Sequence, residues 1–223
     1  MKYIYHHLGL GDHIICNGLV RNIVKKGGDY SLFVYRHNME SVKFMYRDLD
    51  NLSFIDTYDD GFILEFIKSN NVSEDDFIRI SLTGWSREIT WDQNFYFQHG
   101  VDFKERWDSF HVVRDEIREK KLYDLLNPED EDFILIHNKG SDEIDRIDYF
   151  FIDDKFKKIY VESITENIFD YLLLIERAKE IHCIQSSFHH LVDSFDLNSN
   201  LFFHTKKINR GAPHKIKDKW RVV

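Results

Sequence analysis

The sequence is poor in the features that mark secreted and membrane-spanning proteins. It has only two cysteines, Cys16 and Cys183, and both fall in expected helix or strand, where a thiol acts as a small buried hydrophobe of a reducing compartment. No apolar run is long enough to span a bilayer, and Met1 leads into the first expected strand without the hydrophobic region of a signal peptide. We therefore expect a cytoplasmic protein, which leaves open action on membrane-linked substrates.

Basic residues are outnumbered by acidic ones, 30 to 39. The formal net charge of −9 argues against a dedicated nucleic-acid-binding protein. Basic residues are concentrated in the tail over residues 206–223, which has seven Lys and Arg against one Asp. This tail suits contact with a diphosphate, through Arg210, or peripheral contact with an anionic membrane surface. Alternatively, Trp220 holds the tail against the protein and the lysines are solvated.

Apolar and aromatic residues, in contrast, are abundant enough for packed cores, at 43% and 15% of 223 residues. Strand and helix patterns alternate along the chain, which is typical of a parallel sheet with covering helices. Strands are expected at residues 3–5, 31–35, 52–55, 77–82, 133–137, 159–161, 182–184 and 201–203. We predict an α/β fold of two small Rossmann-like domains that face each other across a cleft, with boundaries 1–127 and 128–223.

The first strand opens into a Gly-Leu-Gly turn, residues 9–11, and Asp12 follows where a helix N-cap is expected. This arrangement presents backbone N–H groups and the positive end of a helix dipole to a ligand. The site is not a dinucleotide fingerprint, because Ile14 replaces the third glycine and the second strand runs into Arg36 instead of an acidic residue. A Walker loop is excluded as well, since no Gly-Lys-Ser/Thr follows the glycines.

A second strand-turn-helix pattern lies near the C-terminus. The strand ends at Gln185, Ser186 and Ser187 form the turn, and His190 falls in the first turn of the helix. Serine hydroxyls and free N–H groups at this position suit a phosphate or pyrophosphate. The alternative is that one serine only caps the helix and the histidines lie on the surface.

These two motifs, LGDHI at residues 10–14 and SSFHHL at 186–191, resemble those of GT-B glycosyltransferases of the heptosyltransferase kind. That family has Gly-Asp at the start of its first helix and an Asp-Thr/Ser-Gly-x-x-His-Leu turn in its second domain; here Gln185 and Ser187 replace the Asp and the Gly. The resemblance implies a nucleotide-sugar donor on the C-terminal domain, an acceptor near the N-terminal domain, and no obligatory metal. It makes Asp12 the candidate base, and Ser186, Ser187 and His190 candidate ligands of the donor phosphates.

Inverting glycosyl transfer needs a base for the acceptor hydroxyl, and Asp12 or His13 could supply it. It also needs N–H groups or cations to stabilise the departing nucleoside diphosphate. We expect this from Gly11 in the glycine turn, and from Lys139 and Arg146 in the loop after the strand at 133–137. The alternatives are plain N-capping for Asp12 and a solvated loop for the two cations.

Metal binding is not expected. Asp48-Leu49-Asp50 imitates the Asp-x-Asp motif of the other large glycosyltransferase fold, but such spacing arises easily among 39 acidic residues. The adjacent pairs His6-His7 and His189-His190 have diverging side chains and no third ligand at a suitable spacing. We expect no cofactor either, with the nucleotide sugar as a substrate.

The hypothesis is a glycosyltransferase that moves a sugar from a nucleotide-sugar donor to a glycan or glycolipid acceptor, as in polysaccharide biosynthesis. Inversion is favoured because Asp12 supplies a base. The alternatives are a pyruvyl transferase or nucleotide-sugar epimerase on the same two-domain plan, or a non-catalytic nucleotide-binding protein. The sequence does not determine the donor, the acceptor, whether transfer is inverting or retaining, or the oligomeric state.

Overall fold

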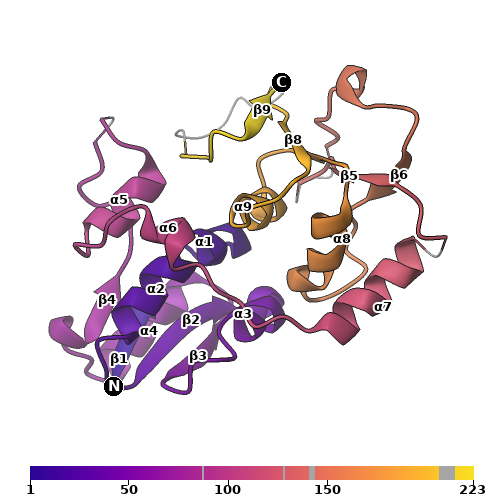
Figure 1. The fold of residues 1–223 in the computed structure, drawn as a ribbon. Helices are drawn as coiled ribbons and strands as arrows, with labels where there is room; N and C mark the ends of the chain where they lie inside the picture. The colour runs from indigo at the N-terminus through magenta and orange to yellow at the C-terminus, as the bar shows by residue number, and fades with distance from the viewer. Residues whose placement is uncertain (87, 128, 141–143, 206–213) are drawn as a thin grey trace. The chain divides into compact units, whose positions relative to one another are not determined.

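The computed structural model describes residues 1–86, 88–127, 129–140, 144–205 and 214–223 (Figure 1). Contacts between residues divide the chain into two compact units. The N-terminal unit comprises Met1–Val113 and also contains His214 and Lys215, whereas the C-terminal unit begins at Arg114 and contains Ile216–Val223. Each unit is built around a sheet of its own.

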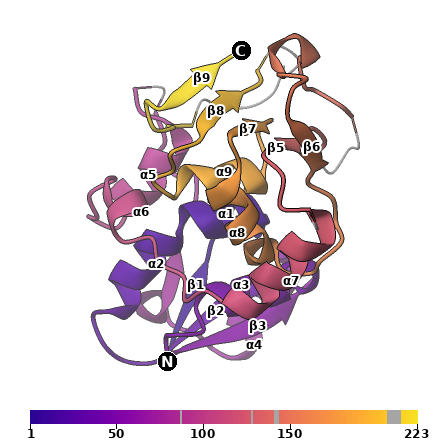
Figure 2. The same ribbon diagram turned by 45° about the vertical axis from the view of Figure 1, so that its right-hand side comes forward.

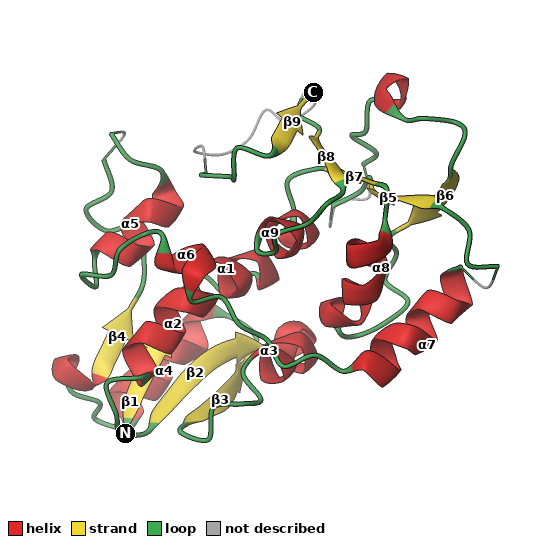
Figure 3. Ribbon diagram, in the orientation of Figure 1, coloured by secondary structure: helices red, strands yellow, loops and turns green. Residues whose placement is uncertain are grey.

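The described strands of the N-terminal unit form a parallel sheet in the order β3-β2-β1-β4 (Figure 3). These strands are β1 (Lys2–Tyr5), β2 (Tyr30–Tyr35), β3 (Leu52–Thr57) and β4 (Phe77–Arg79). The strand expected at residues 77–82 is shorter than predicted, because the backbone of Ser81 bonds to the side chain of Gln98. The alternating strands and helices of this half otherwise form as the sequence indicates.

Helices cover both faces of this sheet. On one face, Phe33 of β2 packs in a hydrophobic cluster with Ile63 of α4 (Asp60–Ser69). Leu32 and Val34 alternate with Phe33, so they point to the opposite face, where both are fully buried. Further helices of the unit are α1 (Leu10–Ile15), α2 (Asn17–Val24), α3 (Met39–Met45), α5 (Trp91–Phe97) and α6 (Glu105–Asp108).

The helix expected after the glycine turn is divided at Cys16 into α1 and α2. The hydroxyl group of Tyr96 in α5 donates a hydrogen bond to the C=O of Ile15 at 2.7 Å, which satisfies a carbonyl at the end of α1. Gly18 lets α2 approach α6 closely, since a Cβ atom there would lie 2.0 Å from the backbone oxygen of Glu105. Tertiary contacts therefore determine where the expected helix is divided and how closely α2 packs against α6.

The described strands of the C-terminal unit form a second parallel sheet in the order β6-β5-β7-β8-β9 (Figure 2). These strands are β5 (Phe133–His137), β6 (Lys157–Tyr160), β7 (Glu180–Cys183), β8 (Asn200–Phe203) and β9 (Trp220–Val222). Strand β5 is buried from Phe133 to Ile136, as expected for an inner strand of a parallel sheet. Two parallel sheets with helices confirm the predicted α/β class.

The division between the units precedes α7 (Glu116–Leu126), whereas the sequence places the domain boundary after this helix, at 127/128. Helix α7 packs against the 3-10 turn Ile168–Tyr171 and α8 (Leu172–Arg177) of the C-terminal unit. An ion pair of 2.8 Å between Arg118 and Asp170 fixes it there. Because these partners lie far along the chain, the local sequence of α7 could not assign it to either unit.

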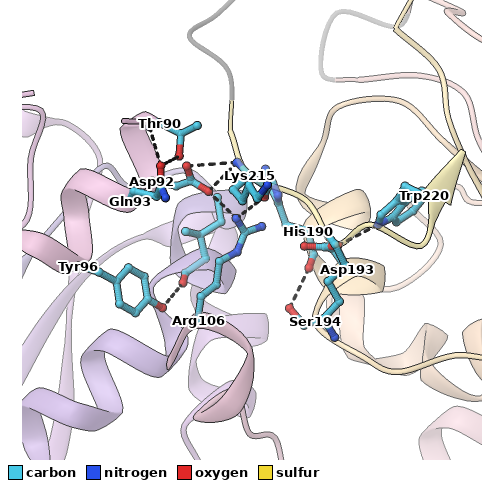
Figure 4. A network of polar contacts seen from close by, with 12 residues as sticks. Thr90, Asp92, Gln93, Tyr96, Arg106, His190, Asp193, Ser194, Lys215 and Trp220 are labelled. Atoms are coloured by element: carbon cyan, nitrogen blue, oxygen red, sulfur yellow. Dashed lines mark hydrogen bonds and ion pairs between the residues drawn. The ribbon is translucent and has the colours of Figure 1, made fainter. Parts of the chain in front are cut away.

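The C-terminal residues are held by Trp220, as one interpretation of the tail predicts. Trp220 is 6% exposed and lies in β9, which pairs with β8. Its indole N–H donates a hydrogen bond of 2.8 Å to Asp193 in α9 (Ser187–Asp193) (Figure 4). Strand β9 itself was not predicted, because three residues carry no usable periodicity.

Both cysteines are free and buried, as expected from their positions in the sequence. Burial raises the pKa of each thiol, so neither is an activated nucleophile. Within the described residues, no helix combines the length and the apolar character needed to cross a membrane.

Candidate active site

Both motifs follow strands at points where the strand order of a sheet reverses. In the N-terminal unit, the chain moves from β1 to β2 and β3, and then returns to β4 on the other side of β1. In the C-terminal unit, it moves from β5 to β6 and returns to β7 on the other side of β5. Open α/β sheets bind ligands beyond the carboxyl ends of the strands at such reversals. The first motif follows β1 and the second follows β7, so each unit has its motif at the expected binding position.

The turn after β1 is held by the buried side chain of Asn38, which donates a hydrogen bond of 2.9 Å to the C=O of Leu8. Gly9 is the N-cap of α1, with φ −63° and ψ 142°. A Cβ atom at Gly9 would lie 2.9 Å from Oδ2 of Asp12, so the glycine leaves room for this carboxylate. Asp12 is therefore the third residue of α1, and the prediction that it is the N-cap is wrong.

The Asp12 carboxyl group is partly buried, directly after Gly11 in the first turn of α1. Burial raises its pKa from 3.8 to about 7, and the hydrogen bond from its own backbone N–H offsets only part of this effect. A carboxylate with a pKa near neutrality holds a proton more strongly than an ordinary Asp, which suits a general base. The environment of Asp12 is therefore compatible with the predicted role.

His13 lies in a different environment from Asp12. It is fully buried, and its ring packs edge-on against His6 with centroids 4.3 Å apart. Among the described residues, neither ring nitrogen of His13 has a hydrogen-bond partner. Burial, followed by the neighbouring His6, keeps the pKa of His13 well below its ordinary value. His13 is thus a neutral imidazole enclosed by protein, and its catalytic role stays a prediction.

In the C-terminal unit, Ser186 is the N-cap of α9. Its Oγ accepts a hydrogen bond of 3.2 Å from the N–H of His189 and lies 3.2 Å from Nδ1 of His137. Ser187, the first residue of α9, is only partly buried, while His190 is 5% exposed. Capping by Ser186 agrees with the alternative stated for the sequence, but the same alternative places the histidines on the surface and this part is wrong, because His189 and His190 are buried. Binding of phosphate by Ser186, Ser187 and His190 stays a prediction.

Lys139 and Arg146 lie in the loop that follows β5. An antiparallel bridge pairs Lys139 with Asp145, and the N–H of Arg146 donates a hydrogen bond of 3.0 Å to the C=O of Asn138. The Asp145 carboxylate accepts from the Asn138 amide at 2.9 Å and from the Tyr149 hydroxyl at 2.5 Å. Backbone and side-chain hydrogen bonds therefore order the described residues of this loop, which include Lys139 and Arg146.

The predicted site residues thus fall into two groups, one in each unit. The N-terminal unit holds Gly11, Asp12 and His13, and the C-terminal unit holds Lys139, Arg146, Ser186, Ser187 and His190. Arg210 lies outside the described residues.

The structure adds residues that the sequence analysis missed. Asn38 supports the glycine turn, His137 contacts the capping serine, and Asp145 organises the loop after β5. Two of them occupy positions that a sequence can reveal, since His137 ends a strand and Asn38 precedes a helix. Their partners are distant in sequence, so the contacts themselves could not be predicted.

The Asp-x-Asp motif is part of a different arrangement. Arg21 donates two hydrogen bonds to the Asp48 carboxylate, of 2.8 and 2.9 Å, and so holds its pKa below the usual value. Arg21 also lines a cavity of about 640 Å³ together with Lys25, Asn51 and His111. This cavity lies between the end of α2 and the start of β3, at the amino ends of the parallel strands. The glycine turn follows the carboxyl end of β1, so it lies at the opposite end of the strands.

No family model and no curated protein matches the sequence. Solved structures do match. The glycosyl transferase family 9 protein from Veillonella parvula aligns with a TM-score of 0.60 and 11% identity over 100% of this chain and 86% of that chain. The iron-containing dodecameric glycosyltransferase TibC from enterotoxigenic E. coli aligns with a TM-score of 0.52 and 11% identity, over 90% of this chain and 57% of that chain. The E. coli heptosyltransferase WaaC aligns with a TM-score of 0.44 and 7% identity.

The chain has a GT-B-like fold. This confirms the fold expected from the resemblance between the two motifs and those of heptosyltransferases. At 11% identity the likeness concerns the fold alone. The GT-B-like fold places the glycine turn and the serine turn at the strand-order reversals of two separate Rossmann-like sheets.

Proposed function

We propose that the protein is a glycosyltransferase that moves a sugar from a nucleotide-sugar donor to a glycan or glycolipid acceptor, with inversion. The observation that carries the proposal is the Asp12 carboxyl group, placed at the strand-order reversal of a GT-B-like sheet with a pKa raised to about 7. In the proposed reaction, ionised Asp12 takes the proton of the acceptor hydroxyl as its oxygen attacks the anomeric carbon. The nucleoside diphosphate leaves from the opposite face of the sugar.

The donor would bind to the C-terminal unit. A leaving diphosphate needs hydrogen-bond donors and positive charge. Ser187 offers a partly exposed hydroxyl beside the turn after β7, and Lys139 and Arg146 lie in the loop after the neighbouring strand β5. The loop and the turn are linked by the contact between His137 and Ser186. The neighbouring positions of this loop and this turn support a diphosphate site at the reversal between β5 and β7.

The proposed reaction uses no cofactor, because the nucleotide sugar brings its own leaving group, and it assigns no step to a metal. TibC is described as iron-containing, so metal dependence is best tested directly. Transfer measured after treatment with a chelator, and again after addition of Mg²⁺ or Fe²⁺, tests this part of the proposal. Activity that is lost with the chelator and regained with a metal would contradict it.

A thermal-shift screen against UDP, GDP, ADP, CMP and their sugars tests the donor. A ligand at 100 times its Kd stabilises a folded protein by about 2.7 kcal/mol, which is readily detected. The nucleotide that gives a shift is then supplied as its sugar, with detection of hydrolysis and transfer products by mass spectrometry. Transfer of a sugar supports the proposal, whereas an epimerised sugar or a transferred pyruvyl group identifies another enzyme. Absence of any shift contradicts nucleotide binding.

A further inference from the structure

A continuous chain of hydrogen bonds runs through the C-terminal unit beside the proposed donor site. The backbone N–H of Asp148 donates to Nδ1 of His204 at 3.1 Å. Nε2 of His204 lies 3.1 Å from Nδ1 of His182, and Nε2 of His182 lies 3.3 Å from Oε2 of Glu180. His182 is fully buried and His204 is 1% exposed. Two buried imidazoles thus connect the backbone of Asp148 to the partly exposed carboxylate of Glu180, and the four groups come from three segments of the polypeptide.

The positions of the protons in this hydrogen-bond chain follow from the Asp148 N–H at one end. An amide N–H can only donate, so Nδ1 of His204 has no proton and its Nε2 carries one. This Nε2–H donates to Nδ1 of His182, so the proton of His182 is on Nε2, where it faces the Glu180 carboxylate. All donors therefore point from Asp148 towards Glu180. Each imidazole is neutral and present as a single tautomer.

The hydrogen-bond chain connects the sheet to the loop after β5. Glu180 and His182 belong to β7, and His204 directly follows β8. Asp148 ends the loop that carries Lys139 and Arg146, and the same loop is anchored by Ile147 in a hydrophobic cluster with β5. The His182 ring stacks on Phe202 with centroids 4.4 Å apart and planes 2° apart, which fixes its orientation.

We propose that His182 and His204 are positioning residues that hold the loop after β5 in its donor-binding conformation, and that protonation of either imidazole releases the loop at Asp148. This rests on the proposed function, because it takes the loop as part of the donor site. A proton added to His204 occupies Nδ1, so this nitrogen can no longer accept the hydrogen bond from the N–H of Asp148. A proton added to His182 opposes the Nε2–H of His204, and the shift of tautomer that relieves this again places a proton on Nδ1 of His204.

Of the charged groups around the two imidazoles, some favour protonation of the rings and others disfavour it. Glu180 favours a proton on His182, and Lys155 lies close enough to Glu180 to interact with it. On the other side, the Arg221 guanidinium lies 5.7 Å from the centroid of the Phe202 ring and disfavours a further positive charge. Burial also disfavours the charged form and lowers the pKa of His182 to about 4.

Two substitutions of His204 separate positioning from bulk packing. In His204→Asn, the side-chain oxygen can take the place of Nδ1 and accept from the Asp148 N–H, but it does not titrate. In His204→Phe, the ring is kept and the acceptor is lost. Uniformly ¹⁵N-labelled full-length protein is used for all three forms, and amides of β2 report whether the rest of the fold is intact.

At pH 7 we expect the imidazole ¹⁵N spectrum to show both His182 and His204 as Nε2–H tautomers. The exchange protection of the Asp148 amide should be alike in wild type and His204→Asn, and about tenfold lower in His204→Phe, the equivalent of one hydrogen bond. As the imidazoles titrate on lowering the pH, protection should fall in wild type and persist in His204→Asn. An Nδ1–H tautomer at either histidine, or full protection in His204→Phe, would overturn the proposal.

Binding of inorganic pyrophosphate, measured by calorimetry, keeps this proposal distinct from the proposed function. If the loop contributes to a diphosphate site, His204→Phe weakens pyrophosphate binding and His204→Asn retains it. If the amide and tautomer results are as expected but pyrophosphate does not bind to any form, His182 and His204 still position the loop, and it is the donor site that fails.

Discussion

Nδ1 of His137, the last residue of β5, lies 3.2 Å from Oγ of Ser186, which caps the helix after β7. The His137 ring also stacks on Phe188 with centroids 5.3 Å apart. Burial lowers the pKa of His137 to about 4, so the imidazole is neutral near pH 7. This contact joins two turns that follow neighbouring parallel strands, and it gives Ser186 a structural role, while its role as a phosphate ligand stays a prediction.

Ser186 and Ser187 should therefore respond differently to substitution by alanine. Ser186→Ala removes the cap of α9 and should lower the free energy of unfolding of the C-terminal unit by about 1 kcal/mol. Ser187→Ala removes no cap, so it should leave the stability near that of wild type and weaken binding of nucleoside diphosphate. Urea denaturation and calorimetry measure the two effects. Equal diphosphate affinity in Ser187→Ala and wild type would remove Ser187 from the proposed site.

Asp12→Asn tests the proposed base. The side chain keeps its shape but cannot accept the proton, so kcat should fall by about 10²-fold or more with nucleotide affinity nearly unchanged. In the wild type, kcat/KM should rise with pH through about 7, because only the ionised carboxylate acts as a base and burial raises its pKa to this value. Near-wild-type turnover in Asp12→Asn would show that another group is the base.

The same carboxyl group should affect stability with a defined sign. The folded protein keeps the Asp12 proton up to about pH 7, whereas the unfolded chain releases it near 3.8. The folded state therefore binds more protons in this window, and the contribution of Asp12 to stability is lost as pH rises through it. Relative to wild type, Asp12→Asn should therefore become more stable as the pH rises from 4 to 7. A difference independent of pH would mean that Asp12 has an ordinary pKa.

Gly18→Ala should destabilise the N-terminal unit. The added methyl group would lie 2.0 Å from the backbone oxygen of Glu105, which cannot move aside without displacing α6. We expect a loss of about 1–3 kcal/mol in the free energy of unfolding. Gly61→Ala is the control, because its methyl group would meet only the side chain of Asp59, at 3.1 Å. A Gly18→Ala protein as stable as the control variant would contradict the close approach of α2 and α6.

Asp92 and Arg106 form a buried ion pair in the N-terminal unit, with exposures of 0% and 2% (Figure 4). Arg106 also donates to the C=O of Lys215 at 2.6 Å, and the Lys215 N–H donates to Asp92 at 3.1 Å. Arg106→Met leaves a buried carboxylate without its cation and should cost about 3–5 kcal/mol.

The double variant Asp92→Leu/Arg106→Met is the control, since it removes both charges together. It should be more stable than Arg106→Met alone, as measured by urea denaturation. Hydrogen exchange at the Lys215 amide should increase in the double variant, which removes its acceptor Asp92, and less in Arg106→Met, which keeps this acceptor. A loss below 1 kcal/mol in Arg106→Met would show that the pair contributes little.

His6 should make the N-terminal unit sensitive to acid. Burial lowers its pKa from 6.5 to about 4, so the folded state binds fewer protons than the unfolded chain between these values. The contribution of His6 to stability is present above pH 6.5 and is lost as pH falls towards 4, at about 1.4 kcal/mol per pKa unit. His6→Met should reduce the slope of unfolding free energy against pH in this window. An unchanged slope would place the acid sensitivity elsewhere.

The sequence by itself determined the α/β class, the approximate positions of the strands other than β9, and the turn in each unit where site residues are proposed. These depend on local patterns: apolar runs of strand length, glycine and serine at strand ends, and helical periodicity after them. One interpretation of the sequence also had Trp220 hold the tail against the protein, but its hydrogen-bond partner, Asp193, was not predicted.

Only the tertiary structure decided which strands are neighbours and how each side chain is used. Strand order places β1 beside β4 and β5 beside β7, and this makes each turn a strand-order reversal. Burial, which depends on the whole unit, raises the pKa of Asp12 and keeps His13 neutral. The chain from Glu180 to Asp148 joins residues from three segments, and the direction of its protons follows from contacts that no local pattern contains.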